Sequence, residues 1–221
     1  MRISSSMRSL TTLAFCALPW LASGQQSAPS LQQLSRGAQH AIHLAADSLT
    51  ADGLPGDALR AKAAEGVLKG ADENRILVAV HRLSAELREA KGALGGVSES
   101  EIVAGASALH AGASADVLRE MRVLVEPNGA AGRLTMPLVV LADLVSRGAP
   151  VKVAGESVLS LLSHHATDAD LQVLRAGVER DILTGIDPAA AALTRSRAIA
   201  DALSGSAGAR QSSPSRFPPN E

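Results

Sequence analysis

Residues 70–98 read GADENRILVAVHRLSAELREAKGALGGVS, and this stretch indicates the fold of the whole chain. Its apolar residues recur every three or four positions, which is the spacing of one helix face: Ile76, Val80, Leu83, Leu87, Ala90 and Leu94. Charged residues such as Arg82 and Glu86 fall largely on the other faces, where we expect solvent. A glycine, an apolar residue and a helix-capping residue stand in that order at both ends. We therefore predict a long helix over 73–92 with a sharp corner at each end.

The same kind of triplet recurs along the chain. The seven examples are Gly53-Leu54-Pro55, Gly70-Ala71-Asp72, Gly96-Val97-Ser98, Gly112-Ala113-Ser114, Gly148-Ala149-Pro150, His165-Ala166-Thr167 and Gly185-Ile186-Asp187. The first residue of a triplet suits the left-handed position that ends one helix, and the third is an N-cap or a proline that begins the next. An apolar residue four positions further on completes a hydrophobic staple. Each triplet therefore predicts a helix-to-helix corner.

These corners and the apolar spacing predict an all-α fold of about nine short helices. The expected ranges are 31–51, 56–69, 73–92, 99–111, 115–126, 136–147, 151–164, 168–184 and 188–204. They fit a helical-hairpin array or an irregular multi-helix bundle in one domain, 31–204. Because 205–221 is rich in Gly, Ser, Pro and Arg without apolar periodicity, we expect a disordered tail there, and a flexible segment over 25–30.

The first 24 residues have the pattern of a secretory signal peptide. Arg2 and Arg8 form a basic start, 10–18 is apolar, and Ala22-Ser23-Gly24 suits cleavage, which would leave Gln25 at the new N-terminus. We therefore expect a periplasmic or extracellular protein, with no stable membrane insertion once the signal is removed. Removal of the two arginines leaves 19 basic residues against 22 acidic ones, so nucleic-acid binding is not expected.

The composition excludes several kinds of site. No Phe, Tyr or Trp occurs between Gln25 and Arg216, so the chain there has no aromatic platform for sugars, bases or quaternary amines. The single cysteine, Cys16, lies in the predicted signal, which leaves no thiol nucleophile, disulfide or Cys-based metal site elsewhere. Neither a nucleophile elbow nor a phosphate-binding glycine loop nor a zinc-peptidase motif is present, so no cofactor is expected.

One group of residues could bind a metal ion. His40, His43 and Asp47 are spaced by three and four positions, which puts them on one helix face, as metal ligands would need. Leu34, Ala38, Ala41, Ala45 and Leu49 define the expected buried stripe of that helix, so the three polar residues lie nearly opposite it. A solvated face is therefore the alternative interpretation of this group.

A second candidate is the pair His164-His165 with Asp168 and Asp170. Here the alternative is ordinary helix-end chemistry, because a cation suits a helix C-terminus and carboxylates suit the first turn of the next helix. His81 and His110 are single histidines within predicted helices and give no further indication of a site.

Three functions of different class remain open. The helix-and-corner plan is similar in architecture to tetratricopeptide and HEAT repeats, although the aromatic positions that mark tetratricopeptide units are absent, so the likeness implies no function. The leading hypothesis is an exported helical interaction or scaffold protein that binds a protein partner or self-associates. The alternatives are a metal- or small-ligand-binding bundle and an enzyme whose site the sequence does not reveal.

Overall fold

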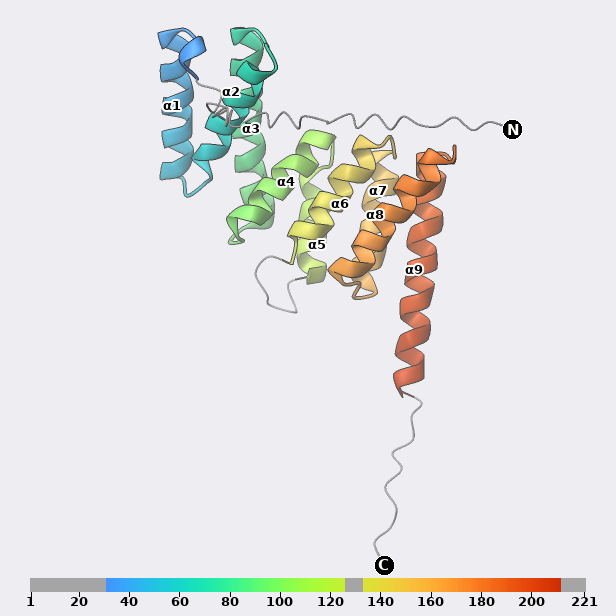
Figure 1. The fold of residues 1–221 in the computed structure, drawn as a ribbon. Helices are drawn as coiled ribbons and strands as arrows, with labels where there is room; N and C mark the ends of the chain where they lie inside the picture. The colour runs from blue at the N-terminus through green and yellow to red at the C-terminus, as the bar shows by residue number, and fades with distance from the viewer. Residues whose placement is uncertain (1–30, 126–132, 212–221) are drawn as a thin grey trace, which may run out of the picture.

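The computed structural model describes residues 31–125 and 133–211, and this part of the chain is helical without any strand (Figure 1). The predicted all-α fold is therefore confirmed. After the 3-10 turn η1 (Leu31–Gln33), the helices are α1 (Arg36–Ala51), α2 (Gly56–Leu68), α3 (Glu73–Leu94), α4 (Glu99–Ala111), α5 (Ala115–Val125), α6 (Thr135–Ser146), α7 (Val151–Ser163), α8 (Asp168–Leu183) and α9 (Pro188–Gln211). The predicted signal at 1–24 and the segment 25–30 lie outside the described residues.

Six of the seven predicted corners form as Schellman-type helix ends. The first residue of each corner has a positive φ: Gly53, Gly70, Gly95, Gly112, Gly148, His165 and Gly185. At six corners the next residue donates its N–H to the carbonyl five residues earlier, over 2.9 to 3.1 Å, as Leu54 does to Leu49 and Ile186 to Asp181. Side chains cap five of the following helices, as Asp72 does by accepting from the Arg75 N–H at 2.9 Å. Helices α2 and α7 begin instead after Pro55 and Pro150, which provide no side-chain cap.

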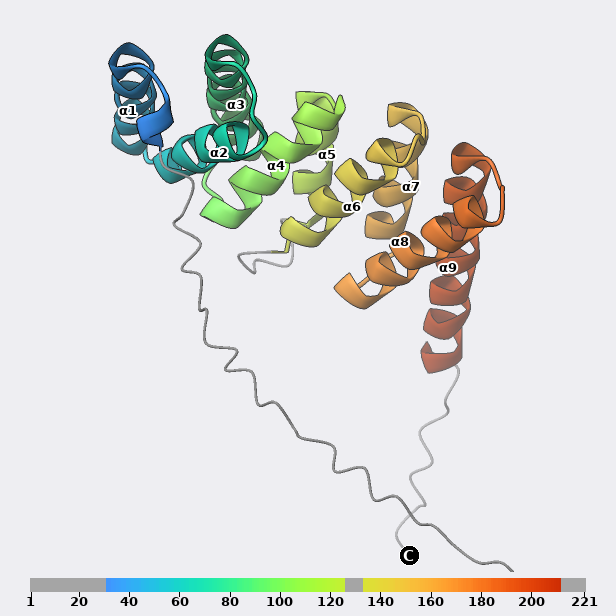
Figure 2. The same cartoon turned by 45° about the horizontal axis from the view of Figure 1, so that its top comes forward.

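The helices stack in two rows (Figure 2). One row contains α1, α3, α5, α7 and α9, each packed against the next, and the other contains α2, α4, α6 and α8. In the second row α4 packs closely on α6, and α6 packs on α8, whereas α2 and α4 have at most marginal contact. Helices of the second row run parallel, since Ser100 and Thr135, both near helix starts, have hydroxyls 3.4 Å apart. This arrangement is a helical-hairpin array, with the second row on the inner side of its shallow curve.

Small aliphatic residues build the core between the rows. The largest fully buried side chains are Ile42, Leu49, Leu59, Leu87, Leu94, Leu118, Met121, Leu138, Leu141, Leu144, Leu161 and Leu171. Alanines fill the spaces between them, and α3 and α4 approach so closely that a Cβ on Gly105 would lie 3.1 Å from that of Ala90. Such close packing compensates for the missing aromatic rings.

Charged side chains join neighbours of the second row. Asp143 of α6 accepts from Arg147 at 2.7 Å on its own helix and from Arg175 of α8 at 3.0 Å. Arg147 also lies 3.2 Å from the Glu179 carboxylate. These neighbouring carboxylates, Asp143 above all, raise the pKa of Arg147, so this link between α6 and α8 stays ionised.

Four expectations need correction. The first helix begins at Arg36 rather than at 31, because the Ser35 hydroxyl accepts from the Ala38 N–H and caps it there. The buried stripe of α1 is Ala38, Ile42, Ala46 and Leu49, so Ala41 and Ala45 lie at its edge. The third corner turns at Gly95 instead of Gly96. Helix α9 continues to Gln211, so 205–211 does not belong to the expected tail, and the remainder, 212–221, lies outside the described residues.

The length of α9 has a local explanation. Residues 205–211 contain two glycines, but the other five residues (Ser, Ala, Ala, Arg and Gln) are compatible with a helix, and a formed helix extends more easily than a new one begins. The absence of apolar periodicity in the sequence was therefore not evidence against a helix.

Candidate functional site

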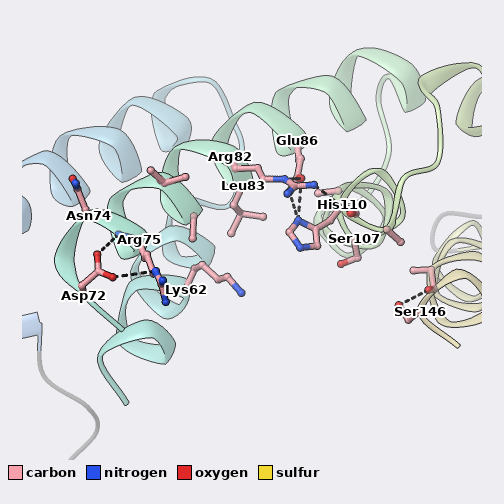
Figure 3. Close-up of a pocket in the computed structure, with 15 residues that line it drawn as sticks. Lys62, Asp72, Asn74, Arg75, Arg82, Leu83, Glu86, Ser107, His110 and Ser146 are labelled. Carbon is pink, nitrogen blue, oxygen red and sulfur yellow. Dashed lines mark hydrogen bonds and ion pairs between the residues drawn. The ribbon is translucent and has the colours of Figure 1, made fainter. Parts of the chain in front are cut away.

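A groove of about 850 Å³ runs along α3 (Figure 3). It exists because α3 is longer than either neighbour that packs on it. Helix α4 runs antiparallel to α3 and ends level with Arg82, whose guanidinium lies 3.4 Å from the carbonyl oxygen of His110 near the end of α4. The first half of α3 therefore has α2 on one side and no part of α4 on the other. The ends of α4 and α6 close the far end of the groove.

The floor of the groove is apolar. Val78 is 66% exposed there, and Ala79 and Leu83 lie beside it on α3. Ala106 of α4 and Ala142 of α6 complete the surface. A valine at the centre of a concave apolar surface loses water-exposed area when any apolar group binds, which is favourable by about 25 cal/mol per Å². The floor therefore suits apolar side chains of a ligand.

A buried carboxylate lies at one end of the groove. Only 10% of the Glu86 side chain is exposed. The Arg82 Nε donates to its Oε1 at 2.8 Å, and the His110 Nδ1 lies 3.0 and 3.2 Å from its two oxygens. A carboxylate removed from water needs such donors, so the Nδ1 of His110 carries a proton in this arrangement. These three residues form a fixed polar end to the groove.

The other end of the groove carries charged side chains, and Figure 3 shows Arg75 paired there with Asp72, with Lys62 nearby. Arg75 lies 3.1 Å from the Asp72 carboxylate, and the Lys62 ammonium lies 2.9 Å from that of Glu65. Hydrogen bonds from Lys69 and then Lys62 lower the pKa of Glu65 to about 2. Both charged ends are thus neutralised within the protein, which leaves an apolar floor between polar rims.

The hydroxyl groups of the groove are bound to their own helices. Ser107 donates to the Val103 carbonyl at 3.0 Å, and Ser146 donates to that of Ala142 at 2.8 Å. A nucleophilic serine needs a hydrogen bond to a base instead, and neither hydroxyl is bonded to His110. Both hydroxyls are therefore engaged by backbone carbonyls of their own helices.

The predicted metal group lies elsewhere, on the outer face of α1. His40 and His43 are exposed, and the Asp47 carboxylate lies 2.6 Å from the guanidinium of Arg60 on α2. Across the described residues, no group of three or more His, Cys, Asp or Glu is placed to hold an ion. The pairing with Arg60 accounts for Asp47, while the metal hypothesis for the group stays a prediction.

The second histidine group forms a helix corner. His165 adopts a φ of 56° at the corner, and the His164 Nδ1 lies 2.7 Å from the Ser160 carbonyl. Asp170 and Thr167 form a reciprocal capping box at the start of α8. These contacts are those of helix ends and account for the spacing of the group.

Sequence reasoning missed the polar end of the groove. It placed Arg82 and Glu86 toward solvent and gave His110 no role, yet the structure buries Glu86 and brings His110 to it from 24 residues away. The spacing of Arg82 and Glu86 by four residues was a visible signal for their ion pair. The contribution of His110 depends on how α3 and α4 pack, which no local spacing indicates.

Comparison of the chain with protein-family models, with curated proteins and with solved structures finds no match. Among the described helices, none is both long and apolar enough to cross a lipid bilayer. The fold and the groove together define the class of the protein, a helical-hairpin array with an apolar groove.

Proposed function

We propose that the protein is a binding scaffold that holds an amphipathic helix of a protein partner in the groove along α3. The observation that carries this proposal is the exposure of Val78, 66%, at the centre of an apolar floor between neutralised polar rims. Stacked helical hairpins commonly bind partners along such surfaces. An amphipathic helix presents the apolar face that this floor would cover.

The length of the groove supports a helical segment. From Asp72, the N-cap of α3, to Glu86 the lining spans 14 residue steps, or about 21 Å at 1.5 Å per residue. A partner helix of about four turns matches this length. Its apolar side chains would contact Val78 and Leu83, and its polar residues would face the two charged ends.

A small apolar ligand is the second candidate. The volume of about 850 Å³ supports it, because small-molecule sites typically measure roughly 300–1,000 Å³. The groove is open along its length, however, so a compact ligand would leave much of its own surface in water. We therefore place the peptide proposal first.

Peptides selected from a displayed library of amphipathic helices provide the test. Affinity of the selected peptides for the full chain is measured by fluorescence anisotropy, and Val78→Glu is expected to weaken it at least tenfold, or about 1.4 kcal/mol. Val123→Glu is the matched control, since Val123 on α5 is 65% exposed and lies outside the groove. Equal weakening by both variants, or by neither, would contradict the proposal.

We further propose that the scaffold works outside the cytoplasm, on the basis of the signal pattern in residues 1–24. Intact-mass analysis of protein from the native envelope is expected to give a chain beginning at or near Gln25. That chain has almost no absorbance at 280 nm, because Trp20 is removed and no tyrosine is present. A full-length cytoplasmic form would exclude this location.

A further inference from the structure

A second apolar groove, of about 510 Å³, lies at the C-terminal end of the stack. Val173, which is 60% exposed, and Ala176 line it on α8, and Ile199 and Ala202 line it on α9. Helix α8 is the last of its row, and no later helix covers this side within the described residues. The opposite end of the stack differs, because α1 presents exposed polar side chains such as His40 to solvent.

The charges along this groove complement a second copy of themselves. The lining of α8 begins with Asp170 and ends with Arg180, ten residues or about 15 Å further along the helix. When two such helices meet antiparallel, each Asp170 faces the Arg180 of the other copy. Arg180 is exposed and makes no ion pair within the described part of the chain. Two equal salt bridges would then frame the apolar contact.

The linings of α8 and α9 have their midpoints at the same level along the two helices. On α8 the midpoint between Asp170 and Arg180 is residue 175. Arg195 of α9 pairs with Asp181 at 2.6 Å, and a Cβ on Gly177 would lie 3.1 Å from its side chain. Position 195 is therefore level with 177–181 on α8. Because α8 and α9 run antiparallel, four residues forward on α9 correspond to four residues back on α8, so Ile199 is level with 175. Ile199 is also the middle of the α9 lining, which runs from 195 to 203.

We propose that this end face binds the same face of a second copy of the chain. A single two-fold axis through the level of residue 175 and Ile199 places α8 on α8 and α9 on α9, both pairs antiparallel. Such a contact is isologous and closes at a dimer. It uses a surface separate from the groove along α3, so it does not depend on the proposed function.

Charge exchange tests the arrangement directly. Arg180→Glu alone places like charges opposite each other twice, and so does Asp170→Lys alone. Mixed together, these two variants restore both opposite-charge pairs in a heterodimer. Analytical ultracentrifugation over a concentration series is expected to show a dimer for the natural chain, at least tenfold weaker association for each variant, and recovery in the mixture.

A cysteine placed near the axis gives a second, independent measurement. In a Cys16→Ser background, Ala176→Cys is expected to form a disulfide-linked dimer on mild oxidation, because the two copies of position 176 lie side by side. Ala169→Cys serves as the control, since its counterpart would lie far along the partner helix. Because Asp170 also caps α8, this arm keeps the proposal falsifiable where Asp170→Lys fails to fold.

Three results would overturn the proposal. They are a monomeric natural chain at every concentration, no recovery in the mixture of variants, and cross-linking at 169 as fast as at 176. Val123→Glu, on α5 and away from this face, is expected to leave the dimer unchanged.

Discussion

Replacement of two glycines by alanine is expected to have opposite effects on stability. Gly56 is buried at the start of α2, where α2 crosses α1. A Cβ there would overlap the Ala46 carbonyl oxygen and the Thr50 hydroxyl, which are themselves hydrogen-bonded at 3.0 Å. Gly92 lies exposed in α3, and a Cβ there would meet nothing within 4 Å. The same substitution is thus made once in the packed α1–α2 contact and once at an exposed position, and the difference in stability reports on that contact.

The expected magnitudes follow from these surroundings. Gly92→Ala gains the helix preference of alanine, about 0.5–1 kcal/mol. Gly56→Ala forces backbone and side chain apart in a packed contact, which costs about 1–3 kcal/mol. For a chain of this size 1 kcal/mol changes Tm by about 2–4 °C. We therefore expect Tm to rise by about 1–4 °C for Gly92→Ala and to fall by about 2–12 °C for Gly56→Ala.

Thermal melting followed by circular dichroism at 222 nm is the suitable assay. Fluorescence offers little, because no aromatic residue lies between Gln25 and Arg216. A Gly56→Ala protein as stable as the natural chain would refute the close approach of α1 and α2 described here. A loss of stability for Gly92→Ala would instead show that α3 is covered at that point.

Three further predictions concern single sites. Ser98→Ala removes the hydroxyl of the capping box that begins α4 and is expected to cost about 0.5–2 kcal/mol in urea unfolding, with Ser107→Ala, at an exposed serine of the same helix, as the control. If His40 and His43 bind zinc, free zinc at a hundred times its Kd is expected to stabilise the fold by about 2.7 kcal/mol, and the double variant with alanine at both positions should abolish this stabilisation. No effect of zinc on Tm would exclude the site. Hydrogen bonds from Arg195 lower the pKa of Asp181, so the ionised Asp181 stabilises the fold above the ordinary carboxyl pKa, and this stabilisation is lost as pH falls below about 4. Asp181→Asn should therefore make Tm fall less steeply on the acid side. An unchanged slope of Tm against pH would contradict this prediction.

Local chemistry made the corners predictable. A positive φ at a helix end favours glycine, and an N-cap needs a short polar side chain, so both requirements are visible in single triplets such as Gly70-Ala71-Asp72. His165 shows the limit of this logic, because it takes the glycine position with a φ of 56° and was recognised only from its neighbours. The helix boundaries followed from the corners, which is why most of them agree with the structure within two residues.

Relations between distant helices were not predictable in the same way. Glu101 completes a capping box with Ser98 at the start of α4, and its other oxygen also accepts from the Leu134 N–H at 3.1 Å at the start of α6. This buried carboxylate therefore joins two helices. Glu86 follows the same rule, since its burial depends on His110 and on the end of α4. Spacing within one helix shows which residues share a face, but not what lies opposite.

Helix length determines where the groove along α3 lies. Helix α3 has 22 residues between neighbours of 13 residues each. At 1.5 Å per residue this difference leaves roughly 14 Å of α3 beyond the reach of a shorter neighbour. The difference was visible in the sequence, because a helix over 73–92 was expected between shorter helices at 56–69 and 99–111. The second groove has another origin: its lining, 170–180 of α8 and 195–203 of α9, lies on two helices side by side, and no later helix packs on this end of the stack within the described residues. A search of helical-hairpin arrays for long helices with short neighbours would therefore find surfaces of the first kind, whereas surfaces of the second kind depend on where the stack ends.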